Sequence, residues 1–117
     1  MTAAVPLAVT MGEPAGVGGE LSLKAWLARR SGSRSFFVLD DPDRLAALAR
    51  RLGVDVPLRE IERPEEAVSL FSSALPVLPV RLAVAPVPGR PDVANAPATI
   101  EAIERAVRLA QEGTVAG

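Results

Sequence analysis

The sequence predicts an α/β protein with a mostly parallel sheet and flanking helices. Apolar runs alternate with amphipathic segments along the chain, and glycine or proline marks most of the boundaries between them. Such alternation is typical of strand–helix–strand units, in which right-handed crossovers join parallel strands. The length of 117 residues allows one domain at most, or part of one.

The first unit is a strand, a glycine-rich turn and a helix. Residues 5–10 form an apolar run that predicts a buried strand, and residues 20–30 predict a helix. Leu23, Trp26 and Leu27 share one face of that helix. We therefore expect Trp26 to pack in the core.

The second unit is a short apolar strand followed by the best-delimited helix of the chain. Residues 36–39 are continuously apolar, which is typical of a strand covered on both faces. Asp41 is placed to cap the next helix, Pro42 occupies its first position, and Gly53 is placed to end it. An acid at a strand end can also bind ribose hydroxyls, which gives Asp40 and Asp41 a second interpretation. The proline behind Asp41 favours the cap.

The middle of the chain is harder to assign. Residues 57–61 predict a short strand, and residues 65–75 predict one or two helical turns. Two prolines, Pro76 and Pro79, interrupt the pattern that follows. The next strand is therefore expected at residues 81–85.

The last predicted element is a long amphipathic helix at residues 95–112, preceded by a proline-rich loop. Gly113 is placed to end this helix. Its apolar residues recur at helical spacing, and we expect them to face the core. This stripe consists of Ile100, Ile103, Val107 and Ala110.

Composition excludes several classes of function. The chain contains no histidine, cysteine or tyrosine, so it cannot assemble a Ser-His-Asp triad or a thiolate nucleophile, and it lacks the commonest metal ligand. A formal net charge of -1 gives no electrostatic reason to bind nucleic acid or an anionic membrane. No apolar run approaches the ~20 residues of a membrane span, and the N-terminus shows no signal peptide. We identify no catalytic residue and no metal ligand in the chain.

The glycine-rich turn is the most informative feature of the chain. Gly12, Gly16 and Gly18 follow the first strand, and glycine permits both a positive φ and close approach of a ligand to the backbone. A helix that begins at such a turn presents free N–H groups and the positive end of its dipole. Glu13 lies within the turn, where its carboxylate can contact a ligand or accept N–H bonds from the turn itself. We expect a bound anion or cofactor here; a tight connector that needs glycine for its geometry is the alternative.

Two blocks of sequence stand out together. The first is TMGEPAGVGGE at residues 10–20; the second begins with GRPD at 89–92, continues with NA at 95–96 and ends with TIEAIERAV at 99–107. In order and separation these blocks resemble the N-terminal region of the 4-hydroxythreonine-4-phosphate dehydrogenase (PdxA) family. The family usually has proline where this chain has Gly19. The resemblance spans essentially the whole chain, whereas family members are much longer.

The resemblance implies that residues 1–117 are the N-terminal part of a single α/β domain, within a longer two-domain enzyme of the isocitrate/isopropylmalate-dehydrogenase-like fold. It implies NAD- or NADP-dependent oxidation of a small phosphorylated substrate at a divalent metal (Zn, Mg or Co), then decarboxylation, in the synthesis of pyridoxal 5'-phosphate (vitamin B6). It also implies a cytoplasmic homodimer. The residues expected to line the cofactor cleft are Gly12, Glu13, Gly16, Gly18 and Asn95. The family's metal-binding histidines and phosphate-binding residues match nothing here, so we expect this chain alone to be inactive.

Other interpretations remain open. The chain could be a non-catalytic α/β binding module that stands alone, or part of a related enzyme acting on another phosphorylated hydroxy acid or on a dihydrodiol. A receiver-like signalling domain is disfavoured, because it requires a lysine late in the sheet. The only lysine is Lys24, in the first predicted helix.

Overall fold

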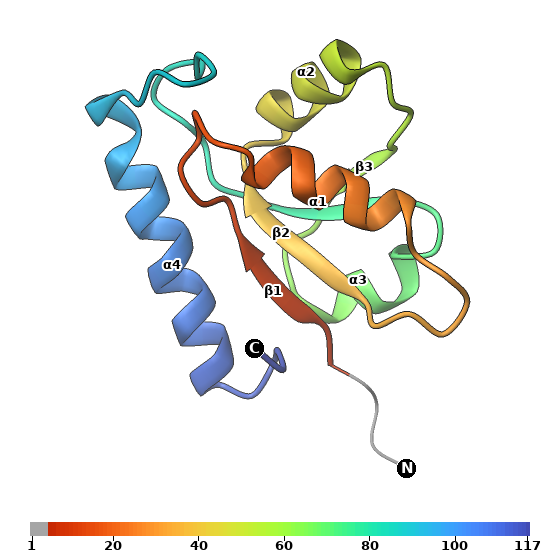
Figure 1. The fold of residues 1–117 in the computed structure, drawn as a ribbon. Coiled ribbons are helices and arrows are strands. Elements are labelled where there is room, and N and C mark those ends of the chain that lie inside the picture. The colour runs from red at the N-terminus through yellow and green to blue at the C-terminus, as the bar shows by residue number, and fades with distance from the viewer. Residues whose placement is uncertain (1–4) are drawn as a thin grey trace.

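The computed structural model describes residues 5–117, which form a four-stranded parallel sheet with helices on both faces (Figure 1). The strand order is β1-β2-β4-β3, and each pair of neighbours is parallel, which confirms the predicted fold class. The elements in chain order are β1 (Leu7–Thr10), α1 (Gly18–Leu27), β2 (Phe36–Asp40), α2 (Pro42–Leu52), β3 (Leu58–Glu60), α3 (Glu65–Leu70), β4 (Leu75–Pro79), the 3-10 turn η1 (Val93–Asn95) and α4 (Ala96–Gln111).

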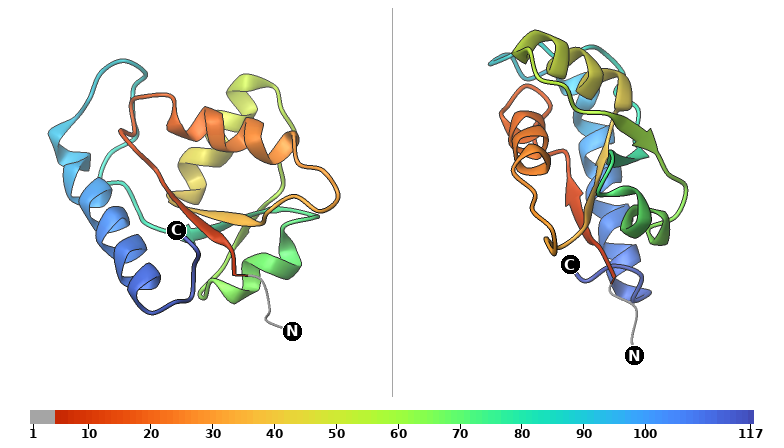
Figure 2. Two further views of the ribbon diagram at one scale, coloured as in Figure 1. Left: turned by 60° about the horizontal axis from the view of Figure 1, so that its bottom comes forward. Right: turned by 90° about the vertical axis from the view of Figure 1, so that its right-hand side faces the viewer.

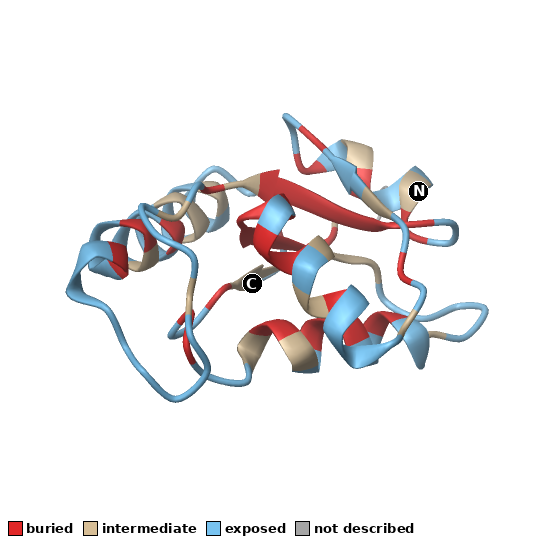
Figure 3. Cartoon of the chain, turned by 90° about the horizontal axis from the view of Figure 1, so that it is seen from above, coloured by how far each residue is buried: buried red, intermediate tan, exposed pale blue. Residues whose placement is uncertain are grey.

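The central strands β2 and β4 carry the core on both faces of the sheet. On β2, Phe37 and Leu39 join the cluster that packs under α3 and α4, whereas Phe36 and Val38 join the cluster under α1 and α2. Figure 2 shows α1 and α3 on opposite sides of the sheet, and Figure 3 shows the central strands as its most buried part. Coverage of both faces, predicted from the continuous apolar run, is confirmed for β2.

Strand β1 lies at the edge of the sheet, so the prediction of a buried first strand is wrong. Its residues are exposed or half-buried. The outer side of β1 contacts the last residues of the chain. Ala116 N donates to Pro6 O at 2.9 Å, and Ala8 N donates to Gly117 O at 2.7 Å. The chain therefore returns to the β1 edge after α4 has crossed the sheet.

Strand β4, which lies between β2 and β3, is formed by Leu75–Pro79. The prediction of a strand at residues 81–85 is wrong. Leu75 N donates to Pro57 O, and Val77 O accepts from Ile61 N, so the residues on either side of Pro76 face the β3 side of the strand. Pro76 therefore faces β2, and β4 pairs with β2 only from Val77 onward. Pro79 ends the strand, beyond the last residue that pairs with β3. Both prolines therefore occupy positions where no N–H is needed for a ladder.

Helix α1 is shorter than predicted and buries a narrower face. Leu23 and Trp26 are buried as expected, and Trp26 Nε1 donates to Phe71 O at 2.9 Å. Leu27, predicted to share that face, is exposed because the helix ends there and the chain turns away.

Helix α4 lies where the sequence predicts it, but its predicted apolar stripe faces away from the sheet. The exposed fractions of Ile100, Ile103 and Val107 are 55%, 49% and 50%. The residues that pack against the sheet are Ala98, Ala102, Ala106 and Leu109. Small alanine side chains allow α4 to approach β1 closely, which explains why this face is the inner one. None of the helices in residues 5–117 is long and apolar enough to cross a membrane.

Candidate functional site

A cavity of about 830 Å³ lies beside the glycine turn, defined here as residues 11–17 between β1 and α1. Its walls are the turn, the adjacent face of α2 and the loop at residues 82–89. These segments follow β1, β2 and β4, so the parallel topology brings them to one edge of the sheet, where α/β proteins place ligands (Figure 1). The lining is mostly apolar, and its acidic members are Glu20, Asp41 and Asp43.

The three glycines at the turn serve different purposes. Gly12 has a φ of +65°, which favours glycine, whereas Gly16 and Gly18 do not have positive φ. A Cβ on Gly16 would lie 3.2 Å from Glu13 O, and one on Gly18 would lie 2.7 Å from Met11 O. The positive φ that glycine permits is therefore adopted at Gly12 and not at Gly16 or Gly18. They allow the turn to close tightly on its own carbonyl groups.

Glu13 stabilises the turn from inside. Its Oε1 accepts a hydrogen bond from Ala15 N at 3.1 Å, and its carbonyl accepts one from Gly16 N at 2.9 Å. This is the turn-internal bonding that the sequence allowed as an alternative to ligand contact. Val17, at the N-cap of α1, offers no side-chain acceptor, so the first N–H groups of that helix have no side-chain cap.

Asn95 holds the loop that forms one wall of the cavity. Its side chain is buried, with Oδ1 accepting from Val84 N at 3.1 Å and Nδ2 donating to Val84 O at 3.0 Å. Asn95 stands at the N-cap position of α4 but makes no side-chain cap there, because both ends of its amide are engaged by Val84. Of the residues predicted to line a cofactor cleft, Gly16 lines this cavity, Gly12, Glu13 and Gly18 lie in or next to the turn, and Asn95 supports the loop.

The two acids at the end of β2 bond to different partners. Asp41 Oδ1 accepts from Asp43 N at 2.9 Å and from Arg44 N at 3.4 Å, which confirms the predicted cap. Its Oδ2 accepts from Leu82 N at 3.0 Å and so anchors the loop after β4. Asp40 is only 1% exposed and pairs with Arg44. Burial raises the pKa of Asp40 to about 6, although the Arg44 guanidinium acts in the opposite direction.

Sequence reasoning missed Arg44, whose guanidinium joins α2 to the glycine turn. Its Nη2 donates to Pro14 O at 3.0 Å. The one signal for its role was the spacing of Asp40 and Arg44 across the start of α2. Arg44 also explains why this chain has glycine at position 19, because a side chain there would contact the guanidinium.

A divalent metal does not fit the part of the chain that the structure describes. In residues 5–117, no three His, Cys, Asp or Glu side chains are grouped so that they could hold a metal ion. That this chain supplies no metal ligand stays a prediction.

The chain is similar to proteins named 4-hydroxythreonine-4-phosphate dehydrogenase. It is 43% identical to one from Xanthobacter autotrophicus over 117 residues, 99% of this chain and 33% of that protein. It is 47% identical to one from Methylorubrum populi over 111 residues, 92% of this chain and 32% of that protein. The crystal structure of another, from Burkholderia phymatum, matches with a TM-score of 0.83 and 29% identity over 97% of this chain and 35% of that chain.

These matches confirm the predicted resemblance and the fold class. No protein-family model matches the chain. The chain spans about a third of the length of the relatives that it matches.

Proposed function

From its similarity over almost its whole length to 4-hydroxythreonine-4-phosphate dehydrogenases, we propose that the chain is the N-terminal part of an NAD(P)-dependent enzyme of that kind. The observation that carries the proposal is 43% identity over 99% of the chain. In this proposal residues 1–117 begin an α/β domain of a two-domain, cytoplasmic homodimer. The whole protein oxidises the hydroxyl of 4-hydroxythreonine 4-phosphate and decarboxylates the product, a step in the synthesis of pyridoxal 5'-phosphate.

The residues around the cavity fit a dinucleotide. Apolar walls suit a nucleobase, the uncapped start of α1 leaves N–H groups for a diphosphate, and a carboxylate suits a ribose hydroxyl. When bound, NAD or NADP supplies the hydride acceptor. The residues proposed to line the cofactor cleft are Gly12, Glu13, Gly16, Gly18 and Asn95, the last acting through the loop that it holds.

The chain's own contribution is binding and orientation. The glycine turn and the loop at residues 82–89 are joined by a bond from Gly89 N to Ala15 O at 3.0 Å, so they form one continuous wall. The metal of the proposed reaction (zinc, magnesium or cobalt) takes its ligands from outside this chain, as does the phosphate of the substrate. We therefore propose that the chain binds a cofactor but does not catalyse turnover.

Calorimetric titration with NAD⁺ and NADP⁺ tests this proposal. We expect saturable binding of one of them, weakened at least tenfold by Gly16→Val, whose side chain would press on Glu13 O and displace the turn that forms one wall of the cavity. Ala110→Val, on the exposed face of α4, is the matched control and leaves binding unchanged. Absence of saturable binding to the folded chain contradicts the proposal. So does equal binding by the two variants.

A turnover assay tests the second half of the proposal. With 4-hydroxythreonine 4-phosphate, NAD⁺ and Mg²⁺ or Zn²⁺, we expect no NADH from the purified chain. Measurable NADH production would show that the chain is catalytically complete.

A stand-alone binding module is the second candidate, because three segments of this chain line a cavity. In that case the chain folds as a monodisperse monomer and binds neither NAD⁺ nor NADP⁺. Relatives that act on another phosphorylated hydroxy acid or on a dihydrodiol keep the cofactor binding and differ only in the substrate.

A further inference from the structure

Arg44 is a buried cation between the end of β2 and the glycine turn. Its side chain is 6% exposed. Nη1 donates to Asp40 Oδ2 at 2.7 Å, and Nη2 donates to Pro14 O at 3.0 Å. The other carboxylate oxygen of Asp40 accepts from Asp41 N at 2.7 Å. The guanidinium therefore connects an anchored carboxylate to one backbone carbonyl of the turn.

In the described part of the chain, three hydrogen bonds join the turn to elements other than β1 and α1. Besides the bond from Arg44, Gly89 N donates to Ala15 O at 3.0 Å, and Thr99 Oγ1 approaches Gly12 O at 3.5 Å. The Gly89 bond comes from an exposed loop, and the Thr99 contact is long. The bond from Arg44 is the one made by a buried, charged donor, and such bonds are the stronger kind.

Gly19 explains how the guanidinium fits against α1. This residue is buried in the first turn of the helix and does not have positive φ, so backbone conformation does not require glycine. A Cβ there would overlap Arg44 Nη1 and would lie 2.9 Å from Arg44 Cζ and 3.0 Å from Leu48 Cδ2. Glycine within a helix is otherwise unfavourable relative to alanine. The missing side chain at position 19 is therefore explained by Arg44.

We propose that Arg44 is a positioning residue for the glycine turn, and that Gly19 and Arg44 form a matched pair in which the missing side chain admits the guanidinium that holds the Pro14 carbonyl. An ion pair that only stabilised α2 would need Asp40 and no contact with the turn. The contact with Pro14 gives Arg44 control over one wall of the cavity. This inference concerns the geometry of the chain and does not depend on which ligand the cavity takes.

Amide hydrogen exchange on the 117-residue chain distinguishes positioning from general stabilisation. Arg44→Lys keeps a cation in place but replaces a planar fork with a single ammonium, which cannot hold both acceptors in the same way. We expect exchange at the Gly16 and Gly89 amides to accelerate at least tenfold, while the amides of β2 keep their rates. Arg50→Lys, an exposed change on the same helix outside the cavity, is the control and alters neither group. Equal acceleration at all sites, or none at the turn, overturns the proposal.

A double-mutant cycle tests the matched pair. Arg44→Met alone leaves the Asp40 carboxylate buried without its partner, so the cycle uses Asp40→Asn/Arg44→Met, which removes both charges. Gly19→Ala is introduced into the wild-type chain, into this double variant and into Arg44→Lys, and urea midpoints are compared.

We expect the midpoint loss caused by Gly19→Ala in the wild-type chain to be at least twice that in the double variant. Arg44→Lys, whose ammonium is narrower, gives an intermediate loss and supplies the comparison if the double variant does not fold. Equal losses in the wild-type chain and in the variant background used show that Gly19 does not serve Arg44.

Discussion

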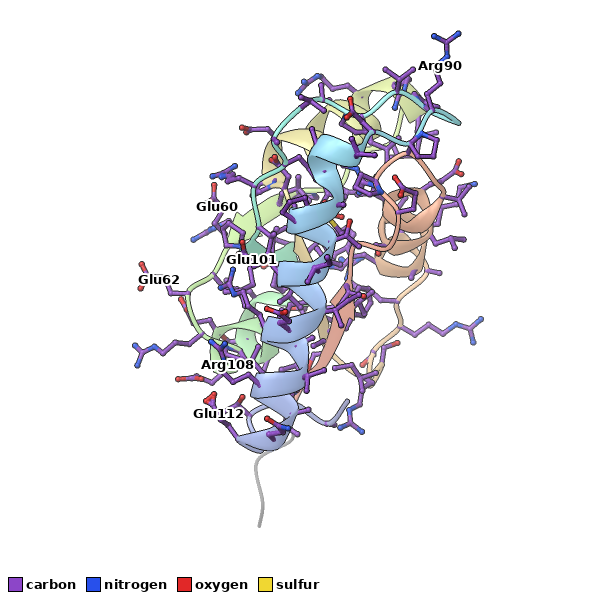
Figure 4. The ribbon with its side chains drawn as sticks, turned by 90° about the vertical axis from the view of Figure 1, so that its left-hand side faces the viewer. Glu60, Glu62, Arg90, Glu101, Arg108 and Glu112 are labelled. Carbon is purple, nitrogen blue, oxygen red and sulfur yellow. The ribbon has the colours of Figure 1, made fainter. Side chains whose placement is uncertain are left out.

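Helices α2 and α4 flank the same sheet, but the residues that they leave exposed differ. On α2 the exposed residues are the charged Asp43, Arg50 and Arg51, together with Ala47 and Leu52, which line the cavity. The outer side of α4 carries Ile100, Ile103 and Val107, each about half exposed. Figure 4 shows three charged residues of α4, Glu101, Arg108 and Glu112, along one flank of the helix. At helical spacing the exposed apolar residues occupy a separate face. A periodic pattern identifies α4 as a helix but cannot select its inner face, because two of its faces are apolar.

The largest expected difference between the two helices is in the free energy of unfolding. Leu45 of α2 is fully buried, so Leu45→Ala removes a filled core position, and we expect a loss of about 2–5 kcal/mol. Ile103→Ala on α4 removes a half-exposed side chain, and we expect a loss below ~1 kcal/mol. Urea denaturation followed by circular dichroism measures both. Similar losses would break the comparison.

The next prediction concerns the buried acid that α2 neutralises. The pKa of Asp40 is about 6 in the folded chain against 3.8 for an unperturbed aspartate, because burial disfavours its charge. The folded state therefore binds the proton more tightly than the unfolded state, and stability falls as pH rises between about 4 and 6. The full shift corresponds to roughly 3 kcal/mol. Asp40→Asn should remove this fall from the pH dependence of urea midpoints; an unchanged profile would show that Asp40 is not its source.

A smaller effect is expected at the capping residue of α2. Asp41→Ala leaves the N–H groups of Asp43 and Leu82 without their acceptor, and we expect a loss of about 1–2 kcal/mol. Asp41→Asn retains one acceptor oxygen in place of two, so it can restore only one of these bonds and should recover only part of the loss. α4 has no side-chain cap at Asn95, so Asn95→Ala should accelerate amide exchange at Val84 while leaving α4 helical. If Asn95→Ala melts α4 instead, the distinction between the two helix starts is wrong.

Local rules account for the elements that were predicted correctly. Asp41, Pro42 and Gly53 delimit α2 because capping and a left-handed glycine depend only on neighbouring residues. Strand β4 was missed because Pro76 and Pro79 are breakers by every local rule. Only the register of the neighbouring strands shows that neither position needs an N–H.

The candidate site also combines features that neighbouring residues determine with features that depend on distant contacts. The glycine turn at the carboxyl edge of β1 was predictable, because its glycines and the strand before it are contiguous in sequence. The bond from Arg44 to Pro14 joins residues 30 positions apart, and the clamp of Asn95 on Val84 depends on the path of a long loop. Such contacts follow from the packing of elements, which local patterns do not determine.

The smallest effect on folding is expected on the outer face of α4. Ile103→Lys replaces a half-exposed side chain with a charged one, so the stability of the monomer should change by less than about 0.5 kcal/mol. The same change should strongly reduce any association that uses this face, because a charge in the middle of an apolar patch must be desolvated. Arg50→Lys on the outer face of α2 is the control and should affect neither property.

Helix α4 presents an apolar face that no other described segment covers, in a chain that spans about a third of the length of its relatives. Size-exclusion chromatography with light scattering, over a range of concentrations, tests this claim most directly. We predict that the mass of the wild-type chain rises with concentration, whereas Ile103→Lys remains at the mass of the monomer. A wild-type chain that stays monodisperse and monomeric, and that melts cooperatively, would contradict the account and favour a stand-alone binding module.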